Sequence, residues 1–158
     1  SIAAYSLVFI AISGSTTASL LYGYPHYAPL QTTIYEIEAA RHIDRTTNER
    51  YIVICDQWMI YAGETVVGVY NPRAYYFPSY DPCGVSLFIE MKQNPTNETM
   101  IKAMKTNNAT TAYFIIQKPR IGEDEYDRII RQARQNKLPT YETFNYEGEE
   151  KLTIFYYK

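Results

Sequence analysis

The stretch Thr33–Tyr70 limits the possible folds of this 158-residue chain more than any other part of it. Within Ile34–Ile43, apolar residues recur every three or four positions, which predicts a helix with one buried stripe. Thr33 and Glu36 have the spacing of a capping box at its start, and we place Glu36 on the solvent-facing side. The apolar run Tyr51–Cys55 is short and bounded by charged residues, which indicates a strand buried on both faces. A helix followed by an interior strand is typical of an α/β fold.

Helical and strand patterns continue to alternate beyond this stretch. Gly63 has the character of a helix C-cap, so we expect the helix after the first strand to end before it. Asn94 and Pro95 resemble an N-cap and a first helical residue, and Asn108 lies in the polar turn after that helix. Residues 71–82 are rich in proline and indicate a loop. The expected helices are 57–62, 95–107 and 124–136, and the expected strands are 65–70, 85–89, 111–117, 141–145 and 152–157.

Together these elements predict a single α/β domain over residues 33–158. It is a sandwich with a mixed sheet flanked by helices, and the last two strands form a closing C-terminal β-hairpin. Residues 1–32 differ in composition, because the apolar run Ile2–Ile12 is followed by a connector rich in proline and tyrosine over 22–31. Eleven residues are too few to span a bilayer, which needs about 20. The run is either a buried strand, which we favour, or the stub of a membrane helix.

Composition narrows the functional classes. Hydrophobic residues make up 46% of the chain, an ordinary globular share that argues against disorder. The 15 basic and 17 acidic residues give a net charge of -2 without any basic excess, so we expect no nucleic-acid partner. Tyrosine is unusually frequent, with 17 residues against 6 Phe and 1 Trp. Because tyrosine suits half-buried positions, these residues either form interfaces and saccharide-facing surfaces or fill a tyrosine-rich core and its rim.

Asp56 is the strongest candidate for a functional residue. It follows the first predicted strand, and the carboxyl ends of such strands open onto the crevice in which α/β proteins bind ligands. Trp58, Tyr61 and Glu64 come next and are expected to line the same space, and an acid beside aromatic rings suits sugar recognition. The alternative role is structural, with Asp56 capping the following helix by accepting from the amides near Met59. Both roles are compatible.

Few other residues bear obvious chemistry. Cys55 and Cys83 allow one disulfide in an oxidising compartment, or else two separate thiols. Neither the cysteines nor the histidines have the spacing of a metal site, and no phosphate-binding loop or catalytic serine motif is present, so we predict no metal and no cofactor. Asn97 and Asn108 each begin a glycosylation tripeptide. Asn108 is the better acceptor, because Asn97 falls in the first turn of a predicted helix.

The main elements of the chain resemble one family of membrane enzymes. The segments concerned are EIEAARHIDRTTNER with YIVICDQWMIYAG, AYFIIQKPRIGEDEYDRIIRQA and EKLTIFYYK. This pattern resembles the extracytoplasmic C-terminal domain of multi-pass glycosyltransferases of the GT-C type, especially archaeal ones, and the likeness covers residues 33–158. Related oligosaccharyltransferases carry WWDYG after the equivalent strand, where this chain has Asp56-Gln57-Trp58. Recognition of glycosylation sequons is therefore not carried over.

The resemblance implies a membrane-tethered, extracytoplasmic domain that is not catalytic by itself, since catalysis in the family depends on acidic residues of the membrane part. Its partners would be that membrane-embedded part and a saccharide, a lipid-linked donor or an acceptor. An alternative is a secreted cell-surface or filament subunit that assembles with neighbouring subunits through the apolar N-terminal strand and tyrosine-rich surfaces. A free-standing enzyme using Asp56 and Glu64 ranks last, because no pair of nucleophile and base can be named.

Overall fold

The computed structural model describes residues 32–77 and 81–158. The helices in this part are α2 (Ile34–Thr46), α3 (Gln57–Val67), α4 (Pro82–Gln93), α5 (Asn97–Asn107), α6 (Lys118–Ile121) and α7 (Glu123–Gln135). The strands are β1 (Tyr51–Ile54), β2 (Ala74–Tyr76), β3 (Thr111–Gln117), β4 (Thr140–Tyr146) and β5 (Glu149–Tyr157). The run 2–12, predicted as either a buried strand or the stub of a membrane helix, lies outside the described residues. The predicted domain boundary after residue 32 lies at their edge.

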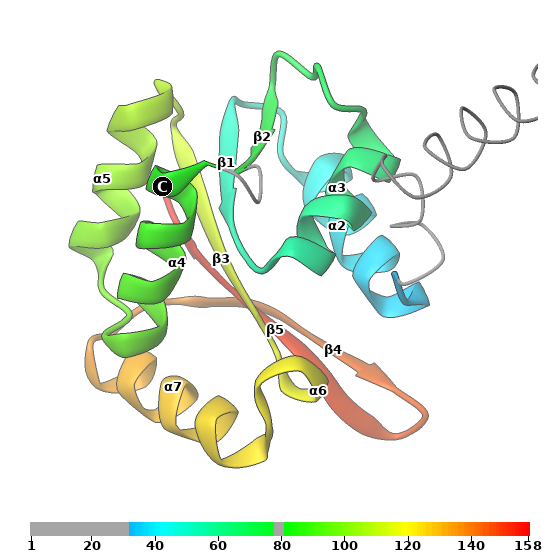
Figure 1. The fold of residues 1–158 in the computed structure, drawn as a ribbon, viewed down its shortest axis with the longest axis vertical. Helices are drawn as coiled ribbons and strands as arrows, with labels where there is room; N and C mark the ends of the chain where they lie inside the picture. The colour runs from blue at the N-terminus through cyan, green and yellow to red at the C-terminus, as the bar shows by residue number, and fades with distance from the viewer. Residues whose placement is uncertain (1–31, 78–80) are drawn as a thin grey trace, which may run out of the picture. The chain divides into compact units, whose positions relative to one another are not determined.

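The strands form one mixed sheet in the order β2-β1-β3-β5-β4, with helices on both of its faces (Figure 1). The apolar residues of α2 and α3 pack on one face, and those of α4, α5 and α7 pack on the other. β1 runs parallel to β2 and β3, whereas β5 runs antiparallel to β3 and β4. The expected α/β sandwich with a mixed sheet and a closing hairpin is therefore confirmed. As a result of the parallel pairing, β1, β2 and β3 present their carboxyl ends at the same edge.

The central strands are those that the sequence indicates most clearly. Every residue of β1 and of β3 is buried, as expected for strands covered on both faces. The helix α7 and the strands β4 and β5 also agree with the expected ranges to within about three residues. α5 begins two residues later than expected, because Thr96 rather than Asn94 caps it and accepts from the amide of Thr99 at 3.3 Å.

The first helix packs through the later part of the predicted stripe, where Ala40 and Ile43 are buried, and departs from it in the first turn. Tyr35 and Glu36 are buried in its first turn, whereas Ile34 is 51% exposed. Glu36 was expected to face solvent, and this prediction is wrong, because its side chain is fully buried and forms an ion pair with Arg120. The carboxylate half of the capping box is present, since Glu36 Oε2 accepts from the amide of Thr33 at 2.5 Å.

The stretch between β1 and α5 contains most of the errors in the predicted elements. α3 runs through Gly63 to Val67 and ends at Gly68, which has a φ of 81°, so the expected strand 65–70 is wrong. The expected strand 85–89 is also wrong, because it lies in α4. Helix-starting features outweigh β propensity there, since Asp81 caps α4 by accepting from the amide of Cys83 at 2.9 Å. The predicted loop 71–82 contains the short parallel strand β2, with α3 as its crossover.

Tyrosines contribute much of the core on the α2 and α3 face. Tyr51 lies edge-to-face with Tyr76 and with Tyr113, at ring-centroid distances of 6.5 and 5.9 Å. All three rings are buried. The reading in which tyrosines fill a core therefore holds for these three, while half-buried tyrosines such as Tyr141 and Tyr156 extend the same cluster toward the surface.

Gly63 provides a test of the packing between α3 and β2. A Cβ atom at this position would lie 2.4 Å from Cε1 of the buried Tyr76 ring. In most helix interiors Gly→Ala stabilises by about 1 kcal/mol. Here we expect Gly63→Ala to lower the free energy of unfolding in urea by about 1–3 kcal/mol, because the ring has to move. Thr65→Ala, on the exposed side of the same helix, is the matched control, and a Gly63→Ala variant as stable as the parent would contradict this packing.

Candidate functional site

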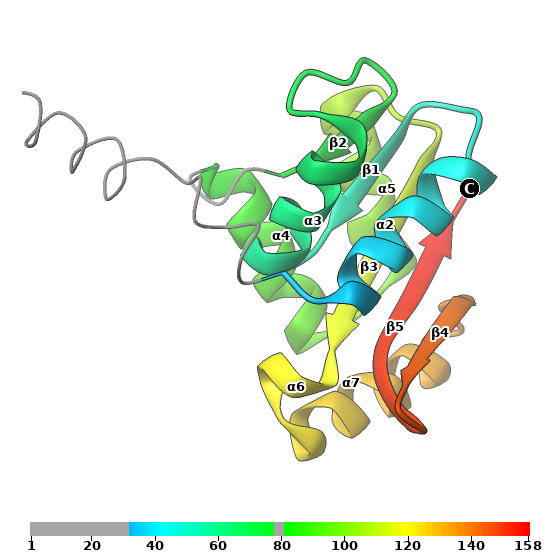
Figure 2. The same cartoon turned by 90° about the vertical axis from the view of Figure 1, so that its right-hand side faces the viewer.

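The carboxyl ends of β1 and β3 bring together side chains from distant parts of the sequence. β1 leads into α3 on one face of the sheet, whereas β3 leads through α6 into α7 on the other face (Figure 2). Parallel neighbours whose connections leave on opposite faces open a crevice at their carboxyl ends, which is the usual ligand position in α/β sheets. Asp56 follows β1 at this point, and Gln117 is the last residue of β3.

Asp56 links the ends of these two strands. Its Oδ1 accepts from the backbone amide of Met59 at 3.0 Å, so the expected role as N-cap of α3 is confirmed. The side-chain amide of Gln117 also donates to both carboxylate oxygens at 2.9 Å. Burial raises the pKa of the Asp56 carboxyl, with a smaller opposing effect of the Met59 amide and a raising effect of the nearby Glu36 charge. The carboxylate is therefore held in place by polar groups but poorly solvated.

Gln117 leaves one acceptor unused in this cluster. Its side chain is 1% exposed, and its amide nitrogen is committed to Asp56. Its Oε1 is buried and has no hydrogen-bond partner in the described part of the chain. Buried polar atoms nearly always have a partner in proteins, so a water or ligand donor next to Oε1 would complete the arrangement.

A second acid and a cation complete the site. Arg120 of α6 donates from Nη2 to Oε1 of Glu36 at 3.2 Å, and its guanidinium lies over the Trp58 indole at 4.7 Å from the ring centroid. The Arg120 side chain is 27% exposed, whereas that of Glu36 is fully buried. Sequence reasoning missed both charged residues. Arg120 could have been recognised from its position just after the second central strand, because residues there are expected to line the ligand crevice of an α/β sheet.

The structure separates the four predicted ligand-binding residues. Asp56 lines a cavity of about 180 Å³ together with apolar residues that include Phe77 and Val85. Trp58 and Tyr61 do not line it; their rings lie 6.3 Å apart, edge to face, and Trp58 contacts Arg120. Glu64 lines another cavity of about 260 Å³ beside β2, where burial raises the pKa of its carboxyl. The four residues therefore do not share one space, because successive residues of α3 face different directions.

The remaining candidates are placed as follows. Cys55 is buried and Cys83 is exposed, and both are free thiols, so the possible disulfide is not formed in this structure. Asn108 is exposed in a left-handed C-cap conformation after α5, whereas Asn97 is the first residue of α5. The Thr99 hydroxyl of the Asn97 tripeptide is buried and donates to Glu90 at 2.7 Å. Within the described residues, no group of three or more His, Cys, Asp and Glu residues is arranged to hold a metal ion.

Comparison with protein-family models, with curated proteins and with solved structures found no match to this chain. Over residues 32–77 and 81–158, no helix has the length and apolar character that crossing a bilayer requires. The geometry at the carboxyl ends of β1 and β3 is therefore the basis for a functional proposal.

The raised pKa of Asp56 predicts a pH-dependent effect of Asp56→Asn. The folded state holds the proton more tightly than the unfolded chain, so ionised Asp56 costs stability above its folded pKa. This cost disappears below the ordinary aspartate pKa of about 3.9, where both states are protonated. Asparagine keeps a capping oxygen but carries no charge.

We therefore expect the free energy of unfolding of Asp56→Asn, relative to the parent, to increase between about pH 3.5 and pH 7. Urea denaturation across this range measures it, with Thr65→Ala as a variant whose difference from the parent stays constant. A relative stability of Asp56→Asn that is flat or falls with pH would show that Asp56 is not destabilised by burial.

Proposed function

We propose that this chain contains a non-catalytic binding domain of an extracytoplasmic, membrane-associated glycosyltransferase-like protein. In this proposal the domain contacts a saccharide or a lipid-linked saccharide through the surface formed by Trp58, Tyr61 and Arg120. The observation that carries it is the Arg120 guanidinium lying over the Trp58 indole, 4.7 Å from the ring centroid, at the carboxyl end of the parallel strands. The glycosyltransferase part of the proposal rests on the sequence resemblance.

The chemistry of this surface suits a sugar that bears a phosphate. Aromatic rings offer an apolar face with a polar edge, against which the C–H face of a sugar ring packs. A guanidinium matches the oxygens of phosphate groups, which join sugars to lipid carriers. The ion pair with the fully buried Glu36 holds Arg120 in place, so little conformational entropy has to be lost when a ligand binds.

The contacts of Asp56 support a positioning role rather than a catalytic one. Its carboxylate accepts from the Met59 amide and from Gln117, so it fixes the first turn of α3 against the end of β3. Trp58 is in that turn. Asp56 therefore fixes the position of the Trp58 indole, and we expect Asp56 to affect ligand binding only indirectly.

The alternative proposal, a cell-surface or filament subunit, has one observation in its favour. Tyr70 is 97% exposed and Val69 is 66% exposed, and both precede the edge strand β2. Exposed apolar residues beside a sheet edge are typical of surfaces that join another chain. The N-terminal strand that this alternative also requires lies outside the described residues.

Binding of sugars to the full chain tests the leading proposal. Protein-detected NMR would be recorded with glucose and N-acetylglucosamine, each as the free sugar, the 1-phosphate and a short prenyl-diphosphate conjugate. We expect shifts at Trp58, Tyr61 and Arg120, with tighter binding of the phosphorylated forms. Trp58→Ala is expected to weaken binding by about tenfold or more, because central aromatic residues dominate such contacts.

Two further variants sharpen this experiment. Arg120→Lys keeps the charge but loses the planar fork, so it should weaken the phosphorylated ligands more than the free sugars. Tyr70→Ala removes an exposed aromatic residue elsewhere and should bind like the parent. The absence of shifts with every ligand would refute the proposal, and concentration-dependent sedimentation of the unliganded chain would then favour the subunit alternative.

A further inference from the structure

Another cavity lies at the opposite end of the parallel strands from the Trp58 and Arg120 surface. It is a cavity of about 240 Å³ at the start of β3, next to the loop that leads from α2 into β1. Tyrosines from three different strands line it: Tyr113 of β3, Tyr141 of β4 and Tyr156 of β5. We call it the tyrosine pocket. None of the residues that line it belongs to the Trp58 and Arg120 surface.

The walls of the tyrosine pocket are aromatic. Tyr141 lies between the other two rings, at ring-centroid distances of 5.2 Å from Tyr113 and 5.4 Å from Tyr156, and both contacts are edge to face. Tyr141 and Tyr156 are half-buried, whereas Tyr113 is 3% exposed. The two half-buried rings therefore present fixed apolar surface to water, and the buried Tyr113 ring supports them from behind.

Hydroxyl groups stand beside these rings. The hydroxyls of Thr47 and Tyr113 are 2.6 Å apart, and those of Thr46 and Tyr141 are also hydrogen-bonded. Burial raises the pKa of Tyr113 to about 12, so this phenol keeps its proton at neutral pH. The Thr46 hydroxyl donates to the backbone oxygen of His42 at 2.6 Å, so the Tyr141 hydroxyl is the donor to Thr46. Because a hydroxyl has one donor and two acceptor positions, both pairs keep acceptor positions for the hydroxyls of a polar ligand.

The rim of the pocket carries one charge of each sign. Lys158 Nζ donates to Oε1 of Glu49 at 2.8 Å, and this hydrogen bond lowers the pKa of the Glu49 carboxyl. The two side chains remain 63% and 45% exposed. Because their charges cancel, the rim offers a donor and an acceptor without favouring an anion or a cation.

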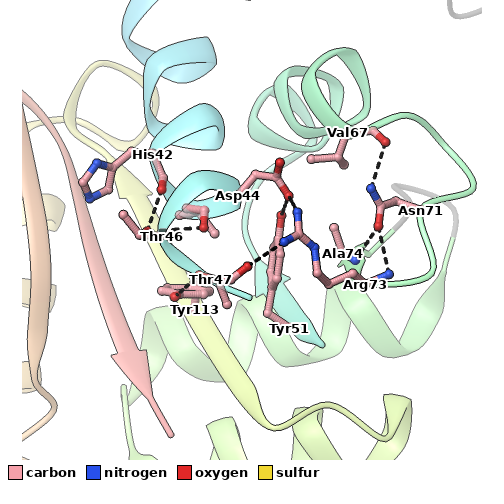
Figure 3. A network of polar contacts seen from close by, with 11 residues as sticks. His42, Asp44, Thr46, Thr47, Tyr51, Val67, Asn71, Arg73, Ala74 and Tyr113 are labelled. Carbon is pink, nitrogen blue, oxygen red and sulfur yellow. Dashed lines mark hydrogen bonds and ion pairs between the residues drawn. The ribbon is translucent and has the colours of Figure 1, made fainter. Parts of the chain in front are cut away.

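The threonine side of the pocket is held by a polar network that joins α2 to β2 (Figure 3). Arg73 donates from Nη1 to the backbone oxygen of Thr47 at 3.0 Å, and its other nitrogen forms an ion pair with Asp44. The Tyr51 hydroxyl also donates to Asp44, at 3.3 Å. The groups that face the pocket are therefore positioned before any ligand arrives, which lowers the entropy cost of binding.

We propose that the tyrosine pocket binds a single neutral pyranose ring. A sugar combines apolar C–H faces with many hydroxyls, which match the tyrosine rings and the threonine and tyrosine hydroxyls. The volume is below the roughly 300–1,000 Å³ of pockets for drug-sized ligands, which fits one ring rather than an oligosaccharide. This inference does not depend on the proposed function, because it concerns other residues at the other end of the strands.

The test uses the full chain and a panel of methyl pyranosides of glucose, galactose, mannose and N-acetylglucosamine. These probes are neutral and carry no phosphate. We expect millimolar binding of at least one of them by protein-detected NMR, with shifts at Thr46, Thr47, Tyr113, Tyr141 and Tyr156. No shifts at high millimolar concentration, or shifts confined to residues around Trp58, would overturn the inference.

Variants distinguish a binding role from a structural one. Tyr156→Ala is expected to weaken pyranoside binding by about tenfold, since it removes one aromatic wall. Thr46→Val keeps the shape and removes one hydroxyl, for which we expect about a three- to tenfold loss. Tyr70→Ala, which removes an exposed tyrosine elsewhere, should bind like the parent. Thermal unfolding of each variant establishes that it is folded, and undiminished binding by both Tyr156→Ala and Thr46→Val would contradict the assignment.

Discussion

The fully buried carboxylate of Glu36 determines how the carboxyl edge of this sheet is built. A charge without solvent is costly unless it is paired, and Glu36 is satisfied by the Thr33 amide and by Arg120. This pair connects the first turn of α2 to α6, which are 84 residues apart in sequence. It also places a guanidinium over Trp58. The surface that we assign to ligand binding therefore depends on an interaction that removes a carboxylate from water.

The two ends of the parallel strands are built differently. At the carboxyl end, Glu36 is fully buried, and Asp56 and Gln117 link β1 to β3 through side chains. At the amino end, the hydroxyls of Thr47 and Tyr113 form a buried pair, and the charged pair of Glu49 and Lys158 stays at the exposed rim. Our proposals therefore place a phosphorylated sugar at the first end and a neutral sugar at the second.

The sequence predicted the features that depend on local patterns. The interior strands Tyr51–Ile54 and Thr111–Gln117 could be predicted because each is a continuous apolar, β-rich run bounded by polar residues. The Asp56 cap could be predicted because its spacing to Met59 is local. The prediction failed at Gly63, where a glycine needed for contact with Tyr76 was interpreted as a helix end. The prediction for Glu36 also failed. Its burial depends on an arginine 84 residues away in the sequence, and no local sequence pattern indicates such a partner.

A double-mutant cycle between Glu36 and Arg120 tests the central claim most directly. The free energy of unfolding in urea would be measured for the parent, Glu36→Gln, Arg120→Met and the double variant. We predict that Arg120→Met alone costs more than the same change made in the Glu36→Gln background, with a coupling of about 1–3 kcal/mol. Additive effects of the two substitutions would contradict the account, because they would show that the buried carboxylate does not depend on Arg120.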